Sequence, residues 1–206
     1  MMWASLCAFG QALAQPIPDS SHAKEPPDIA VAILEKVTGQ KSRPFSTRDF
    51  GRDNLAGPHS VLVPDVKAEA LLWKVRGKLP PGVVAFIGTE RSLAEPPVEG
   101  TELVVASARS QFDILRIAAT DAVNHGKQTE DLVRTLQRWD ERFGVDIYAA
   151  QTDTIQLKLK SLPVDLMTFA NEVYEFCPDI VDQGSGDVRK LAAAIAATKT
   201  VYLWWD

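Results

Sequence analysis

The sequence predicts an α+β fold, in which a mixed or antiparallel sheet has helices packed on it. Expected strands and helices follow one another without the strict alternation that is typical of a parallel α/β sheet. Residues 145–160 read as a hairpin, and on its second strand Ile155, Leu157 and Leu159 alternate with polar residues. The segment before this hairpin carries an apolar stripe at helical spacing, formed by Leu132, Leu136, Trp139 and Phe143.

The first half of the chain is expected to hold two helices and three short strands. In order these are a helix over 28–37, a strand over 61–63, a helix over 65–79, and strands over 83–87 and 102–106. Asp28 and Asp65 are candidates to cap the two helices. Residues 41–57 combine charged residues with Pro, Ser and Gly, and we predict a loop there.

The second half is richer in helix. It is expected to hold helices over 112–119 and 129–143, the hairpin, helices over 163–176 and 187–197, and a strand over 201–205. The last strand is apolar on both faces, which predicts an interior place in the sheet. Both halves contain a helix next to a hairpin, and this hints at an internal repeat.

The N-terminal segment is predicted to lie outside the folded part. Residues 1–14 are apolar, and Ala12-Leu13-Ala14 has the small-x-small form of a signal-peptidase site, although no basic leader precedes it. Residues 15–27 are rich in proline and read as a linker, which leaves 28–206 as a single domain. We therefore expect an exported protein, periplasmic or secreted; the alternative is an uncleaved apolar N-terminus on a cytoplasmic protein.

Composition excludes several classes of function. Charged residues make up 24% of the 206 residues and the net charge is −5, which argues against a nucleic-acid partner. No apolar run reaches the about 18 residues that a membrane span needs. The sequence contains no phosphate-binding loop, dinucleotide fingerprint, CxxC pair or paired histidine ligands, so we expect neither a cofactor nor a dedicated metal site.

Several stretches of the second half resemble one uncharacterised bacterial family, catalogued as domain of unknown function 4253. The stretches are residues 111–116 (QFDILR), 129–132 (TEDL), Trp139, 152–155 (TDTI), 176–184 (FCPDIVDQG) and 204–206 (WWD). The similarity covers about residues 101–206, and a looser one reaches back to about residue 60. The resemblance implies membership of the family and no mechanism, because the family has no assigned activity.

The densest group of functional candidates lies in the 176–184 loop and at 204–206. We select seven binding candidates there: Asp179, Asp182, Gln183, Gly184, Trp204, Trp205 and Asp206. In the leading interpretation the protein is a non-catalytic module that binds a protein or a small molecule. A tryptophan would supply the apolar contact and the polar side chains would orient the partner. The competing interpretation is that at least one tryptophan belongs to the core.

The alternative function is a metal-dependent or acid–base hydrolase that uses clustered carboxylates. It requires Asp179, Asp182 and Asp206 to surround one pocket, where they could hold a divalent cation or divide into an acid and a base. Otherwise Asp179 caps a turn and Asp182 binds nearby backbone amides. No catalytic residue is assigned, and Cys177 is expected to be a buried, unreactive thiol because no histidine stands in a motif with it.

Overall fold

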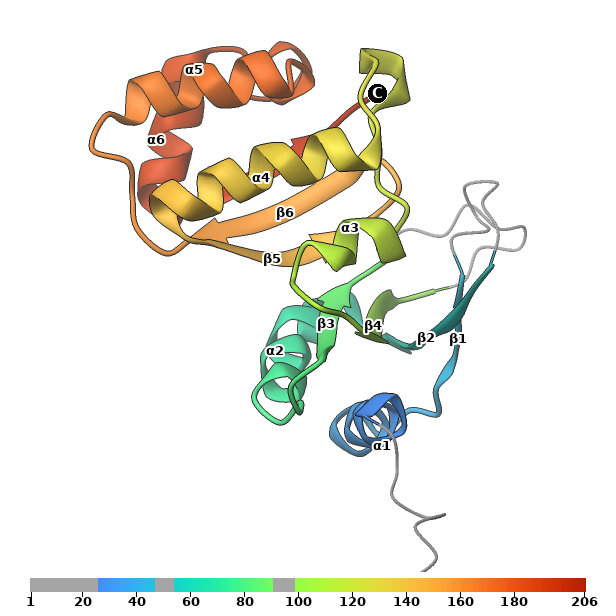
Figure 1. Cartoon of the computed structure of the whole chain (residues 1–206). Helices are drawn as coiled ribbons and strands as arrows, with labels where there is room; N and C mark the ends of the chain where they lie inside the picture. The colour runs from blue at the N-terminus through green and yellow to red at the C-terminus, as the bar shows by residue number, and fades with distance from the viewer. Residues whose placement is uncertain (1–25, 47–53, 91–98) are drawn as a thin grey trace, which may run out of the picture.

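A computed structural model describes residues 26–46, 54–90 and 99–206. Within these residues seven strands form one mixed sheet in the order β1-β2-β4-β3-β5-β6-β7 (Figure 1). The strands are β1 (Arg43–Ser46), β2 (Asn54–Val63), β3 (Val83–Ile87), β4 (Thr101–Ser107), β5 (Val145–Ala150), β6 (Thr154–Leu159) and β7 (Thr200–Trp204). All neighbouring pairs are antiparallel except β3 and β5, which are parallel. The α+β prediction is confirmed.

Six α-helices and two short helices of other types are present in the described part. They are α1 (Pro26–Thr38), α2 (Asp65–Arg76), α3 (Asp113–Ile117), the 3-10 helix η2 (Val123–His125), α4 (Thr129–Phe143), α5 (Leu166–Phe176), the π-helix η3 (Ile180–Ser185) and α6 (Val188–Thr198). None of these described helices combines the length and apolar character of a membrane span. The predicted signal peptide lies outside the described residues, as does the predicted linker up to residue 25; α1 begins inside the linker's last two residues.

The helices cover the two faces of the sheet unequally. Helices α1 and α2 pack on one face, against β2, β3 and β4, around Leu34, Leu72 and Leu103. Helices α3, α4, α5 and α6 lie on the other face, mainly over β5, β6 and β7, where Trp139 and Ile155 are fully buried (Figure 1). The sheet therefore divides the core into two clusters, each dominated by one half of the chain, although Phe45 and Phe86 belong to the second-half cluster and Tyr148 to the other.

The prediction of a loop over residues 41–57 is wrong, because this segment contains β1 and the start of β2. β1 is an edge strand, the place where proline and charged residues are tolerated in a sheet. In the pairing with β2, Arg43 lies opposite Ser60, and both side chains bond to the buried carboxylate of Glu102 at 2.9 and 2.7 Å. The polar and proline-containing composition of residues 43–46 is therefore that of an edge strand and not of a loop.

The interior position predicted for the last strand is also wrong, because β7 forms the opposite edge of the sheet. Its second apolar face consists of Tyr202 and Trp204. Trp204 packs on Gly184 of η3, and Tyr202 points outward and is exposed. The suspected repeat stays a prediction. Both α1-β1-β2 and α4-β5-β6 are a helix followed by an antiparallel hairpin, but the first hairpin lies at the edge and the second is internal.

Candidate functional site

Asp179 hydrogen-bonds to three segments of the chain near its C-terminal residues. It follows α5 and is 8% exposed. Its Oδ2 lies 3.1 Å from Nε2 of His125 in η2 and accepts the backbone N–H of Asp206 at 3.0 Å. Its Oδ1 accepts from the Gln183 amide at 3.3 Å. A buried carboxylate needs such donors to offset the loss of water, so Asp179 clamps η2, η3 and the 206 end together. It does not cap the helix that follows it.

The helix after Asp179 is of the rare π type. The N–H of Gly186 reaches back five residues to the carbonyl of Val181 at 2.7 Å. At its start, the Cys177 thiol donates to the carbonyl of Trp204 at 2.9 Å, and the Trp205 indole N–H donates to the Phe176 carbonyl at 3.4 Å. Single π-helical turns are frequent at functional sites, and here the turn lies against β7 at the edge of the sheet.

Cys177 is fully buried, as the sequence predicts. Burial raises the pKa of its thiol to about 11, and the nearby Asp179 carboxylate adds to the rise. A thiol with a raised pKa stays protonated at neutral pH and is a poor nucleophile. The protonated thiol donates its hydrogen bond to the Trp204 carbonyl and so ties the end of α5 to β7.

The tryptophan pair divides between core and surface. Trp205 is buried, packs edge-on against Phe176, and confirms that at least one tryptophan belongs to the core. Trp204 is half-buried, and its ring lies directly over Gly184, where an added Cβ would be 2.7 Å from Cη2. The ring of Tyr202 is 5.3 Å from that of Trp204, and Tyr202 is 42% exposed. We call Tyr202 and Trp204 the aromatic pair.

The three carboxylates of the hydrolase hypothesis do not share one pocket. Asp182 is exposed, and its Oδ1 accepts from the Tyr174 hydroxyl at 3.0 Å; this bond raises the pKa of Tyr174. Asp206 approaches Asp179 through its backbone N–H, while its side chain lines a small depression of about 240 Å³ beside Asp153. Within the described ranges, no three His, Cys, Asp or Glu side chains are grouped so that they could hold a metal ion.

Three residues of this region were missed by sequence reasoning. His125 lies 54 residues from Asp179 along the chain, and no local pattern links the two. The Tyr174 hydroxyl donates to Asp182 eight residues further along the chain, beyond the end of α5, and helical spacing alone does not predict this contact. Tyr202 could have been predicted from the sequence. It lies two residues before Trp204, and residues two apart on a strand point to the same face of the sheet.

A protein-family model described as a domain of unknown function (DUF4253) matches residues 102–206, slightly more than half of the 206 residues. The chain belongs to this family. The DUF4253 region runs from β4 to β7 and contains the Asp179 clamp, the π-helix and the aromatic pair. No curated protein and no solved structure gives a significant match to the chain. Membership in DUF4253 therefore defines residues 102–206 as the family's domain, and it assigns no activity to them.

Proposed function

We propose that this protein is a non-catalytic binding module and that its binding surface is formed by η3 and the aromatic pair on β7. The observation that carries the proposal is the contact between Gly184 and Trp204. It holds a half-exposed indole at the surface beside the exposed ring of Tyr202. Tryptophan and tyrosine are the residues that most often dominate binding energy in protein interfaces.

Rigidity supports this role. Asp179 and Cys177 fix the π-helix to η2 and β7, and the absence of a side chain at Gly184 lets the indole of Trp204 pack directly on the backbone of this helix. A surface that is ordered before the partner arrives loses less conformational entropy on binding. Gln183, which is exposed and bonded to Asp179, provides an oriented amide at the same surface.

The charges around the aromatic pair indicate the chemistry of the partner. Asp182 on η3, Asp153 before β6 and Asp206 after β7 are all exposed and acidic. Arginine and lysine can pair with such carboxylates and also stack on indole and phenol rings. We therefore propose that the partner is a protein that presents an arginine- or lysine-bearing segment.

A displayed library of random peptides tests the proposal. Peptides selected on the full chain are expected to be rich in Arg and Lys, and to bind Tyr202→Thr and Asp182→Asn at least tenfold more weakly. Glu141→Gln on the exposed side of α4 makes the same charge change far from the aromatic pair and is expected to leave binding unchanged. The proposal would be wrong if the selected peptides bound the wild type and the three variants equally. It would also be wrong if no peptide were enriched in the selection.

One observation favours the acid–base hydrolase as a second candidate. The imidazole of His125 is partly exposed and its Nε2 lies 3.1 Å from the buried carboxylate of Asp179, an arrangement that can position a general base. Turnover of p-nitrophenyl esters or phosphates that His125→Gln abolishes would support it. Equal turnover by the wild type, His125→Gln and buffer would remove this candidate.

A further inference from the structure

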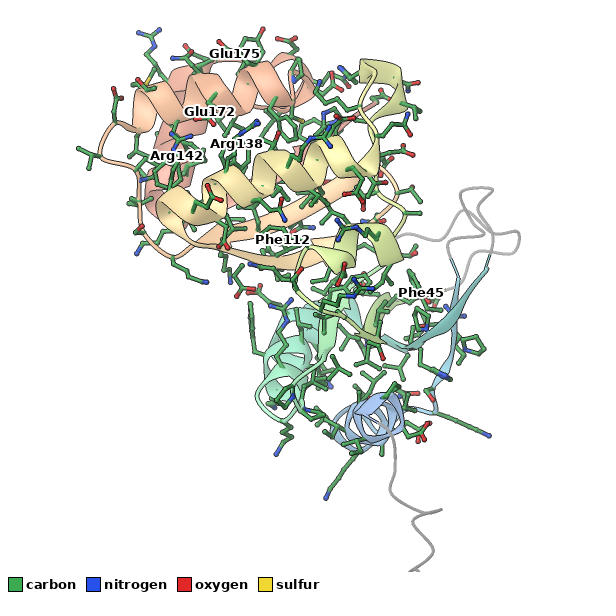
Figure 2. All side chains as sticks on the ribbon, viewed as in Figure 1. Phe45, Phe112, Arg138, Arg142, Glu172 and Glu175 are labelled. Carbon is green, nitrogen blue, oxygen red and sulfur yellow. The ribbon has the colours of Figure 1, made fainter. Side chains whose placement is uncertain are left out.

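A second region with ligand-binding character lies between α4 and α5, on the outer side of the helix layer. It is a groove of about 440 Å³ that Lys127, Arg134, Thr135 and Arg138 line on the α4 side, and Glu172, Glu175 and Phe176 on the α5 side. Figure 2 shows Arg138 and Glu172 in the space between the two helices. The groove lies on a different part of the surface from the aromatic pair and shares no residue with it.

The arginines on the side of α4 that borders α5 follow the helical period. Arg134, Arg138 and Arg142 recur every four residues on α4 and so form one stripe. The buried stripe of the same helix, which includes Leu132 and Trp139, faces the sheet. Helix α4 therefore anchors itself with one face and presents a row of guanidinium groups to α5 with another.

The two outer arginines of this stripe already have partners. Nη1 of Arg142 lies 2.8 and 2.7 Å from the two carboxylate oxygens of Glu172, which also accepts the Trp139 indole N–H at 2.7 Å. Arg134 pairs with Asp131. Both carboxylate oxygens of Glu172 therefore accept hydrogen bonds already. The charges of Arg142 and Arg134 are each paired with a carboxylate and are not available to bind a ligand.

Arg138 and Lys127 are different. Arg138 makes a single hydrogen bond, 3.0 Å to Oγ1 of Thr135, and the ammonium of Lys127 lies 5.9 Å over the ring of Phe176. Among the described residues neither cation forms an ion pair. Thr135 is only 7% exposed, and because its oxygen accepts from Arg138, its own proton is left to donate. Arg138, Lys127 and Thr135 thus line one groove, and within the described residues neither cation is paired with a carboxylate.

We propose that this groove is a binding site for a small ligand that carries a carboxylate or phosphate group. Arg138 supplies the fork of N–H donors that matches such an oxyanion, Lys127 adds a second positive charge, and Thr135 donates its hydroxyl proton. Asp131 and Glu172, which also line the groove, are paired with Arg134 and Arg142, and Glu175 opposes the charges of Arg138 and Lys127, so the net charge of these seven groups is about +1. A ligand with few negative charges therefore fits better than a polyanion. This favours a small molecule over a nucleic acid.

Titration of the full chain with inorganic phosphate and, separately, with acetate tests the site. The readout is the NMR signal of the Trp139 indole N–H, which bonds to Glu172 at the wall of the groove. Sodium chloride at the same ionic strength corrects for screening. We expect a saturable shift with at least one of the two anions, and the anion that gives it identifies the bound group.

Three variants separate a specific site from a general response to charge. Arg138→Gln and Lys127→Gln are expected to weaken the anion at least tenfold. Lys74→Gln, on the exposed side of α2, is expected to leave its affinity unchanged. No saturable shift with either anion, or an equal loss in all three variants, would overturn the proposal. The result is independent of the peptide experiment on the aromatic pair.

Discussion

Arg76 and Gln111 hydrogen-bond to the same residue of β5, Ile147, from the two opposite faces of the sheet. Nη2 of Arg76, at the end of α2, donates to the Ile147 carbonyl at 2.5 Å. The N–H of Ile147 donates to Oε1 of Gln111, just before α3, at 3.0 Å. The two side chains together satisfy both backbone groups of this residue.

This arrangement exists because the two halves of the sheet barely pair. β3 and β5 are joined by one residue pair, Ile87 with Ala149, so the rest of β5 has no strand partner on that side. Side chains take the place of the missing strand. Arg76 also donates to the Ala85 carbonyl at 2.7 Å, and the Gln111 amide donates to the Val145 carbonyl at 2.9 Å. Buried backbone groups without such partners would destabilise the fold.

Gln111→Ala is therefore expected to lower the free energy of unfolding by about 2 kcal/mol, because it leaves the Ile147 N–H and the Val145 carbonyl without partners. Urea denaturation followed by circular dichroism measures the change. Gln137→Ala, on the exposed side of α4, is the matched control and is expected to change stability by less than about 0.5 kcal/mol. Equal effects of the two substitutions would show that the Gln111 amide does not bridge the sheet.

Asp179→Ala is expected to cost about 3 kcal/mol, since it removes the acceptor for His125, Gln183 and the Asp206 N–H at once. Asp182→Ala removes an exposed carboxylate from the same helix and is expected to cost well under about 1 kcal/mol. Chemical denaturation of both variants gives the comparison. If the two variants are equally stable, Asp179 does not act as a clamp.

The Cys177 thiol gives a prediction about high pH. Its pKa is raised to about 11 in the folded protein, above the usual value of about 8.5 for an unfolded chain. The unfolded chain therefore loses its proton first, and the free energy of unfolding is expected to fall by up to about 1.4 kcal/mol per pH unit between roughly pH 9 and 11. The difference in stability between the parent and Cys177→Ala, measured across this range, isolates the contribution of the thiol.

A thiol reagent tests the same burial directly. In a Cys7→Ser background, Ellman's reagent at pH 8 is expected to leave the folded protein unmodified and to react fully in 6 M guanidinium, a concentration on the order of that which unfolds stable domains. Rapid modification without denaturant would contradict the buried, protonated state of Cys177.

Gly184→Ala is expected to displace the Trp204 ring, because the new methyl group would lie 2.7 Å from Cη2. Overpacking in a well-packed core costs about 1–3 kcal/mol, and the cost here is expected to be at or below the low end of that range because the half-buried ring can move aside. Near-ultraviolet circular dichroism and thermal unfolding would report the loss of the ring's fixed position. Gly77→Ala is a control, because its Cβ would meet only ordinary contacts of 3.5 Å or more and its φ of −64° suits alanine. An unchanged spectrum for Gly184→Ala would mean that the indole is not held there.

Secondary structure was predictable where the burial pattern was regular. The apolar stripe of α4 and the alternation of β6 are strong because each element buries one face only. β1 was missed because an edge strand tolerates proline and charge, so Arg43 and Pro44 looked like loop residues. The position of the last strand was misjudged because the apolar residues of β7 have two different roles. Val201 and Leu203 are buried in the core, whereas Tyr202 and Trp204 form the aromatic pair at the surface.

The amino-acid sequence by itself determined the α+β class, the buried faces of α4 and β6, the burial of Cys177 and the segments that mark the DUF4253 family. The first three follow from local spacing and composition, and the family follows from the likeness of those segments to other members. Only the tertiary structure decided that Asp179 meets His125, that Trp204 rests on Gly184, and that Arg138 faces α5 without a carboxylate partner. Such contacts join segments that loops separate, and their geometry depends on how whole elements pack, which residue spacing does not encode.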